Sequence, residues 1–314
     1  MDEHLQRALE LAEHGRGTTH PNPVVGAVVV NDGAVVGEGW HERAGGPHAE
    51  VVALEAAGER ARGSALYVTM EPCARHGRTP PCVDAVLASG VRRVVAGSLD
   101  PGHDSGGGLE RLRAEGVEVE LADLFEARAL NEAWRTWVTT GRPFVIYKAA
   151  MTIDGRVTVP GSRWVSGEQS RRFVHELRAG VDAVAVGMGT VRADNPRLDA
   201  RDVDVARQPR RLAFGHGPLS DGSTLELRTG PIPDELRTLA DEGVQSLLLE
   251  GGPTLATAFL EQGLVDKILL FVAPRLSGSG PAVLGELSRP RTLTRIDAER
   301  VGEDVLVSGY LHDP

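Results

Sequence analysis

Both cysteines of this chain lie in one short segment, and a His-x-Glu pair lies upstream of that segment. The pair is His48 and Glu50, and the cysteines are Cys73 and Cys82. One imidazole and two thiolates give Zn²⁺ three protein ligands and leave a fourth position open for water, which is typical of a catalytic zinc site. Glu50 follows the histidine ligand by two residues, so it can exchange protons with that water without binding the metal.

The order H-x-E, then P-C, is typical of zinc-dependent base deaminases, whose common form closes with C-x-x-C. Here eight residues separate Cys73 from Cys82, so the loop between the thiolates is longer. We interpret His48, Cys73 and Cys82 as the ligands of one Zn²⁺ per chain and Glu50 as the catalytic proton carrier.

Two other interpretations of the cysteines remain open. The first is a disulfide, which belongs to oxidising compartments. The first 16 residues are acidic and amphipathic and lack the apolar core of a signal peptide, so we expect reduced thiols and a cytoplasmic location. The second is a structural zinc site in which His76 supplies a fourth ligand.

Length and charge restrict the class of protein. A chain of 314 residues favours two domains, and 41% hydrophobic residues are enough for a packed core. The net charge of −10 argues against nucleic acid as a partner, and no apolar run is long enough to span a membrane. We therefore expect a small-molecule substrate, and a homo-oligomer as the assembly.

Strands and helices alternate along the chain, which indicates an α/β protein. In the first half, we expect helices at 1–15, 48–57, 81–89, 109–115 and 122–139, and strands at 24–30, 34–40, 65–69, 91–98 and 117–121. His48 and Glu50 then lie in one first helical turn and Cys82 in another, where the helix dipole favours a thiolate. A stop signal at 140–143 predicts a domain boundary that separates residues 1–142 from 143–314.

In the second half we expect strands at 144–150, 181–187, 244–250 and 267–272, and helices at 167–179, 234–242 and 253–263. No G-x-G-x-x-G fingerprint follows a strand, because the Gly187-Met188-Gly189 run lacks the third glycine.

With these motifs in view, the chain resembles the bifunctional deaminase–reductase family of riboflavin biosynthesis. In the first half the similarity rests on residues 19–26 (THPNPVVG), 45–50 (GGPHAE) and 71–82 (EPCARHGRTPPC). In the second half it rests on residues 147–150 (YKAA), 154–155 (DG), 162–166 (SRWVS), 177–179 (LRA), 186–198 (VGMGTVRADNPRL) and 250–255 (EGGPTL).

For the first domain, the resemblance implies a cytidine-deaminase-like three-layer α/β/α fold. Its substrate would be a diaminopyrimidinone that carries a ribosylamino 5′-phosphate, and its reaction the hydrolysis of the 2-amino group. Asn22 and His76 match pyrimidine contacts of the family, and Arg78 matches a position that meets the phosphate. The chain departs from the family at Ala74-Arg75 and at Gly102, where substrate contacts could shift.

For the second domain, the resemblance implies a dihydrofolate-reductase-like α/β fold that binds NADPH and reduces the ribosyl group to a ribityl chain. The matching substrate contacts are Ser162, Arg178, Leu198, Arg201 and Glu250. The matching cofactor contacts are Ala150, Trp164, Thr190, Asp194, Gly252, Pro253 and Thr254. The glycines that precede Pro253 let backbone N–H groups approach a phosphate at a helix start.

The segment 215–233 departs most from the family, because it is polar and rich in Gly and Pro where a further apolar strand is usual. This departure leaves coenzyme affinity and the choice between NADPH and NADH open. It also leaves open a second hypothesis, a deaminase whose C-terminal half is an inactive assembly module. A third hypothesis is a protein scaffold with a purely structural zinc ion.

Overall fold

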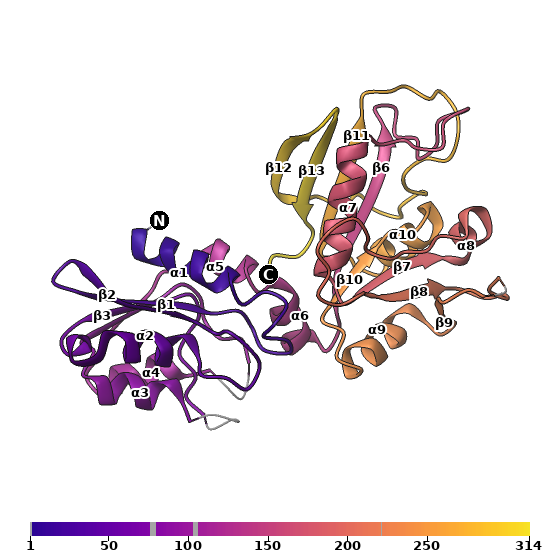
Figure 1. Cartoon of the computed structure of the whole chain (residues 1–314). Coiled ribbons are helices and arrows are strands. Elements are labelled where there is room, and N and C mark those ends of the chain that lie inside the picture. Colours follow the sequence, from indigo (N-terminus) through magenta and orange to yellow (C-terminus); the bar gives the residue numbers. More distant parts are fainter. Residues whose placement is uncertain (1, 76–79, 103–105, 221) are drawn as a thin grey trace. The chain divides into compact units, whose positions relative to one another are not determined.

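The computed structural model describes residues 2–75, 80–102, 106–220 and 222–314. The chain divides into two compact units, Met1–Thr140 and Gly141–Asp313, and the sequence-based boundary lies two residues after this division. The predicted substrate contacts His76 and Arg78 lie outside the described residues, and so does any role of His76 as a zinc ligand. Figure 1 shows the elements of both units.

The first unit is a five-stranded sheet with the strand order β2-β1-β3-β4-β5. β1 pairs antiparallel with β2 and β3, whereas β3, β4 and β5 are parallel to one another. The strands are β1 (Gly26–Asn31), β2 (Ala34–Trp40), β3 (Ala65–Val68), β4 (Arg93–Ala96) and β5 (Glu118–Leu121). The helices are α1 (Glu3–Glu13), α2 (Ala49–Ala57), η1 (Gly58–Ala61), α3 (Cys82–Ser89), α4 (Gly108–Ala114), α5 (Phe125–Ala129) and α6 (Glu132–Thr140).

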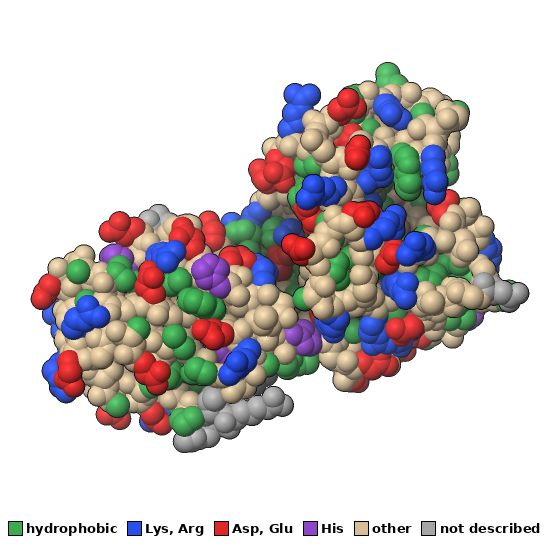
Figure 2. All heavy atoms as spheres, in the orientation of Figure 1, with side chains coloured by type: hydrophobic (Ala, Val, Ile, Leu, Met, Phe, Trp, Pro, Cys, Tyr) green, Lys and Arg blue, Asp and Glu red, His purple; other side chains and the backbone are tan. Residues whose placement is uncertain are grey.

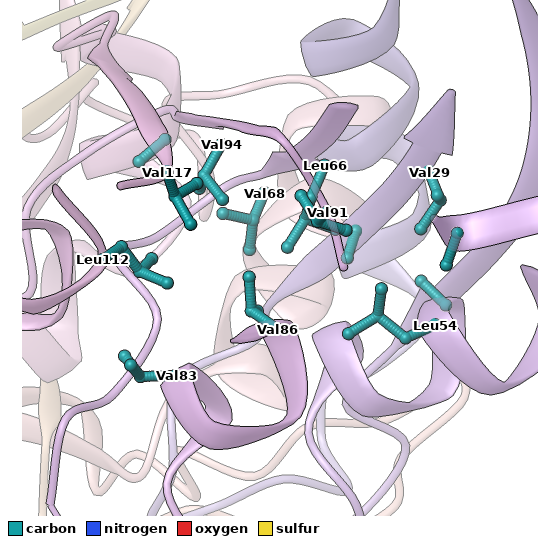
Figure 3. Packing of buried hydrophobic residues seen from close by; sticks show 14 of the residues in the cluster. Val29, Leu54, Leu66, Val68, Val83, Val86, Val91, Val94, Leu112 and Val117 are labelled. Carbon is teal, nitrogen blue, oxygen red and sulfur yellow. The ribbon is translucent and has the colours of Figure 1, made fainter. Parts of the chain in front are cut away.

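Alternation along β1 explains why helices cover both faces of this sheet. Val28 packs with Leu5 and Leu11 of α1. Val29, which points to the opposite face, packs in the cluster that also holds Leu54 of α2. The same cluster includes Val83, Val86 and Leu112 of α3 and α4, as Figure 3 shows. The result is the three-layer α/β/α arrangement that we predict for the first domain.

The second unit is an eight-stranded sheet with the order β12-β13-β11-β6-β10-β7-β8-β9. The six strands from β11 to β9 in this order are parallel, and β13 and β12 add an antiparallel edge. The strands are β6 (Phe144–Thr152), β7 (Ala183–Gly187), β8 (Arg210–Phe214), β9 (Glu226–Arg228), β10 (Ser246–Leu249), β11 (Lys267–Ala273), β12 (Thr294–Val301) and β13 (Asp304–Tyr310). The helices are α7 (Glu168–Gly180), α8 (Met188–Asp194), α9 (Ile232–Asp241) and α10 (Pro253–Glu261).

The parallel strands of this sheet are apolar because both of their faces are covered. Leu247 and Leu249 of β10 pack with Leu236 of α9 and Phe259 of α10 in one buried cluster. The α/β class that we predict for this unit is therefore confirmed. The opposite face of the sheet receives α7, where Phe173 contacts Phe271 edge-on with ring centroids 5.7 Å apart.

Several elements of the fold differ from the sequence-based ones. The helix that we predict at 122–139 is two helices, α5 and α6, which are separated at Leu130 and Asn131. The Asn131 amide is buried there and bonds the backbone N–H and C=O of Val24, at 2.9 and 2.8 Å. The predicted elements also lack α8, β8, the short β9 and the β12–β13 hairpin, whose β12 is almost wholly exposed.

A search of the described residues for a helix long and apolar enough to cross a membrane finds none.

Candidate active sites

The predicted zinc ligands of the first unit come from two helix starts and the loop after β3. His48 is the N-cap residue of α2, and its side chain caps no backbone group. Cys82 is the first residue of α3, and Cys73 lies in the loop that follows β3. The ligand atoms of the three side chains lie within 4.8 Å of one another, and both cysteines are free thiols. The structure thus brings together the three residues that the sequence predicts and shows no disulfide between them.

Of the two nitrogen–sulfur distances in this cluster, the one to Cys73 matches a tetrahedral zinc ion and the one to Cys82 is shorter. His48 Nδ1 lies 3.0 Å from Cys82 Sγ and 3.7 Å from Cys73 Sγ. Zinc binds nitrogen at about 2.0–2.1 Å and sulfur at about 2.3 Å, and a tetrahedral angle then places the two ligand atoms about 3.6 Å apart. The Cys82 backbone N–H also donates to Cys73 Sγ, at 3.3 Å, which helps to hold a thiolate there.

The electrostatics of the two thiols also favour a cation. The hydrogen bond from Cys82 and the one from His48 lower the pKa of Cys73 to about 4, against the effect of burial. The pKa of Cys82 is raised, because this thiol donates its proton to Cys73 and is buried. Metal binding requires both groups as thiolates, so a divalent ion would displace the thiol proton of Cys82.

Glu50 lies in the first turn of α2, next to this cluster, with 3% of its surface exposed. Burial raises the pKa of its carboxyl group, and the nearby His48 opposes that shift. A raised pKa makes the carboxylate a stronger base, which suits a group that accepts a proton during turnover. This position beside the ligands is the one that the His-x-Glu spacing predicts.

The predicted pyrimidine contact Asn22 also lies in the first unit. Its Nδ2 lies 3.2 Å from Nε2 of His41, a residue that the sequence analysis does not single out. Its backbone N–H donates to the Thr19 carbonyl at 2.8 Å. The structure therefore places Asn22 within a hydrogen-bonded loop.

The second unit has a cavity of about 1000 Å³. The following predicted contacts line it: Ala150, Trp164, Arg178, Thr190, Asp194, Arg201, Glu250, Gly252, Pro253 and Thr254. Ser162 and Leu198 are absent from its described lining. The Ser162 hydroxyl donates to the Trp164 carbonyl at 2.8 Å, and Leu198 is buried. Their predicted substrate contacts stay predictions.

A half-buried ion cluster lies in the cavity wall. Arg178 binds both carboxylate oxygens of Glu250, at 2.6 and 3.0 Å, and Lys148 Nζ lies 3.4 Å from Glu250 Oε2. Although burial opposes it, the two cations lower the pKa of Glu250 to about 2. The sequence analysis quotes Lys148 without a role. The sequence feature that could have indicated a role is the position of this lysine within the otherwise apolar strand β6, because a buried lysine is rare unless it is paired.

The start of α10 supplies a second polar wall of this cavity. Gly252 is the N-cap residue of α10 and has no side chain that could accept a hydrogen bond from the first turn. The N–H groups of this turn therefore face the cavity without a side-chain acceptor. A Cβ built on Gly251 would lie 3.1 Å from the Leu255 side chain, a tight contact. The backbone therefore comes close to the cavity where an anion such as a pyrophosphate is favoured. These features fit a dinucleotide cofactor.

Comparisons with known proteins identify the domain family of each unit. Residues 1–98 match the cytidine and deoxycytidylate deaminase zinc-binding region, and residues 143–307 match the RibD C-terminal domain. The riboflavin biosynthesis protein RibD of Aquifex aeolicus is 40% identical, over 97% of this chain and 96% of its own length. RibD of Mycobacterium tuberculosis is 41% identical, over 98% and 96%.

Solved structures show the same similarity. RibD of Acinetobacter baumannii superposes with a TM-score of 0.85 at 34% identity, and 98% of each chain is covered. A diaminohydroxyphosphoribosylaminopyrimidine deaminase/5-amino-6-(5-phosphoribosylamino)uracil reductase from Thermotoga maritima superposes with a TM-score of 0.84 at 35% identity, over 98% of this chain and 97% of that one. The chain therefore belongs to the RibD family of bifunctional deaminase–reductases of riboflavin biosynthesis, with a zinc-binding deaminase domain followed by a reductase domain.

Proposed function

We propose that this chain catalyses two successive steps of riboflavin biosynthesis. The first unit hydrolyses the 2-amino group of 2,5-diamino-6-(5-phosphoribosylamino)pyrimidin-4-one. The second unit reduces the ribosyl group of the deaminated product to a ribityl chain with NADPH. The observation that carries this proposal is that one chain holds both a His-Cys-Cys cluster beside a buried glutamate and a cavity lined by a half-buried ion cluster.

In the deamination, His48, Cys73 and Cys82 hold the zinc ion. Zinc supplies a polarised water that can attack at neutral pH. Glu50 accepts a proton from the attacking water and donates it to the departing amino nitrogen, which leaves as ammonia. Its raised pKa suits both transfers, because the group must gain a proton and lose it within one turnover.

In the reduction, the start of α10 holds the cofactor pyrophosphate, and Ala150, Trp164, Thr190 and Asp194 line the rest of its site. NADPH supplies a hydride to C1 of the ribose. The ring C–O bond breaks, and the ring oxygen needs a proton. We assign that proton to Lys148, whose ammonium group Glu250 holds in the cavity wall. Arg178 and Arg201 provide positive charge for the substrate phosphate.

The two rival hypotheses lack comparable support. An inactive assembly module has no need of a large cavity with a lysine–glutamate–arginine cluster in its wall. A purely structural zinc site has no need of a buried glutamate beside the ligands. β9, in the segment that departs from the family, is only three residues long, so coenzyme affinity and the preference for NADPH over NADH need direct measurement.

The remaining proposals concern partners and location. The partner of each site is a small phosphorylated pyrimidine, and we propose a homo-oligomeric enzyme of the cytoplasm. Figure 2 shows acidic and basic side chains interspersed on the visible face of both units, and the net charge is −10. This distribution gives nucleic acid no extended basic surface on that face.

Calorimetry and an ammonia assay test the proposal. NADPH should bind the purified protein, and ammonia should be released from the diaminopyrimidinone phosphate only by the zinc-loaded form. Failure to bind NADPH at millimolar concentration in the presence of a substrate analogue would favour the assembly module. Equal ammonia release with and without zinc would contradict the assigned chemistry.

A further inference from the structure

His41 lies directly after β2 and uses both of its ring nitrogens. Its Nδ1 lies 3.0 Å from the Pro47 carbonyl oxygen, and its Nε2 lies 3.2 Å from Asn22 Nδ2. The backbone N–H of His41 donates to the Val25 carbonyl at 2.9 Å, which fixes the residue to the start of β1. Only 3% of its surface is exposed, so the ring is enclosed by protein rather than open to solvent.

The two bonds define a single tautomer of the ring. The amide nitrogen of Asn22 only donates, so His41 Nε2 accepts. The ring proton of the neutral imidazole then lies on Nδ1, which donates to the carbonyl oxygen of Pro47. A neutral ring therefore satisfies both partners at once, whereas a doubly protonated ring would face the Asn22 donor with a second donor.

Each partner of His41 adjoins a functional residue. Pro47 immediately precedes the zinc ligand His48, and the His41 ring contacts the His48 ring edge-on with centroids 5.4 Å apart. Asn22 is the predicted pyrimidine contact. Its backbone N–H bonds Thr19, and Asn131 clamps the backbone of Val24 two residues later. The backbone around Asn22 is thus held by other residues, and His41 orients its side chain.

We propose that His41 is a positioning residue of the deaminase site, which joins the orientation of Asn22 to the peptide before His48. The inference rests on the proposed function of the first unit. Because Nδ2 of Asn22 faces the His41 ring, its oxygen Oδ1 faces away from that ring. Asn22 therefore presents an acceptor, and it selects a pyrimidine that offers an N–H donor at that position.

Two substitutions separate the two halves of this role. An asparagine amide nitrogen can take the place of Nδ1, so His41→Asn keeps the bond to Pro47 and loses the bond to Asn22. A glutamine amide oxygen can take the place of Nε2, so His41→Gln keeps the bond to Asn22 and loses the bond to Pro47. Both are neutral residues of similar polarity, so general damage to the fold would affect both variants alike.

We expect opposite patterns from the two variants. His41→Asn should raise KM for deamination by about 3- to 10-fold, the worth of one hydrogen bond, and keep zinc affinity. His41→Gln should keep KM and weaken zinc by about 10-fold or more, as loss of a group that orients a metal ligand does. Zinc affinity is measured by competition with a chelator, and the spectrum of the cobalt-substituted protein reports the ligand geometry without any turnover.

A double variant provides the decisive control for Asn22. If His41 acts on the pyrimidine through Asn22, His41→Asn should cause no further rise of KM in a protein that already carries Asn22→Ala. His14→Asn and His14→Gln serve as matched controls, because His14 lies in the same unit but packs against Trp40 at the end of α1. Neither should change KM or zinc affinity.

Additive increases of KM in the double variant would overturn the proposal. So would the same rise of KM and the same loss of zinc affinity in His41→Asn and His41→Gln. Failure of the proposed function is a distinct result: a zinc-loaded wild-type protein that releases no ammonia. In that case the zinc affinities and cobalt spectra of the two variants still decide whether His41 positions the peptide before His48.

Discussion

The zinc site of the first unit and the ion cluster of the second unit are assembled in different ways. His48 and Cys82 lie 34 positions apart, and each begins a helix beside the same strand end. Lys148 and Glu250 lie 102 positions apart. They meet because β6 and β10 are parallel neighbours in a register that pairs Tyr147 with Leu249, the residues just before them. Two helix starts and the loop after β3 therefore build the first site, and the order of parallel strands builds the second.

This difference predicts that each site can be removed without the other. Cys73→Ala removes one of three zinc ligands, so the protein should lose zinc and with it all detectable ammonia release. Reduction of the supplied deaminated intermediate should stay within about twofold of wild type, since the two sites lie in separate units and share no residue. Zinc content and both rates are measured on the same preparation. The reciprocal variant Lys148→Met should lose reduction and keep deamination. Loss of both activities in either folded variant would contradict the independence of the two sites.

Glu50→Gln should separate the chemistry of the zinc site from its assembly. Glu50 exchanges protons but binds no metal, so the variant should retain zinc and release ammonia about 10²–10⁴-fold more slowly. Zinc analysis and a steady-state ammonia assay check this outcome. Glu55→Gln, an exposed position on the same helix α2, is the control and should behave as wild type. Normal turnover by Glu50→Gln would show that another group carries the proton.

Gly252→Asp tests the cofactor wall of the second site. A Cβ at Gly252 would lie 3.4 Å from Thr190 Oγ1, an ordinary contact, so Gly252→Ala should fold and still bind NADPH. An aspartate is a favourable N-cap residue, so Gly252→Asp should also fold, but its carboxylate should repel the pyrophosphate. Calorimetry with NADPH should show binding to the alanine variant and none to the aspartate variant. Equal binding to the two variants would mean that the pyrophosphate lies elsewhere.

Glu250→Gln should destabilise the second unit in a pH-dependent way. The variant leaves the half-buried Lys148 and Arg178 without their carboxylate, at a cost of about 1–3 kcal/mol in the free energy of unfolding at pH 7. The folded pKa of Glu250 is about 2, below the ordinary 4.5, so the wild-type advantage is complete above pH 4.5 and is lost as the pH falls toward 2. Calorimetric unfolding at several pH values should show that the difference in the free energy of unfolding between the two proteins disappears in acid.

The control for this prediction is Glu176→Gln, which removes an exposed ion pair of α7 with Arg172. Exposed pairs contribute about 1 kcal/mol or less, so this variant should stay close to wild type at every pH. A difference in the free energy of unfolding between Glu250→Gln and wild type that does not change with pH would contradict an ionised Glu250 carboxylate paired with two cations.

The same difference explains which parts of the molecule the sequence predicts well. Cys73 and Cys82 are the only two cysteines of this chain, and with His48 they form a motif of recognisable order and spacing, whose three residues the structure brings together. Lys148 is one of only two lysines, but it belongs to no such motif and meets Glu250 only through the strand order, so its role is missed without the structure. The helix break at Asn131 depends on the distant Val24 backbone, which amphipathic periodicity cannot reveal. The exposed strand β12 lacks the apolar alternation that identifies a strand.

Product analysis tests the central claim, two different reactions at two sites of one chain, most directly. The purified zinc-loaded protein is incubated with 2,5-diamino-6-(5-phosphoribosylamino)pyrimidin-4-one, with and without NADPH, and the products are identified by mass spectrometry. We predict ammonia and the deaminated ribosylamino compound without NADPH, and the deaminated ribitylamino compound with it. An unchanged ribosyl group in the presence of bound NADPH, or an unchanged 2-amino group in both reactions, would contradict the account.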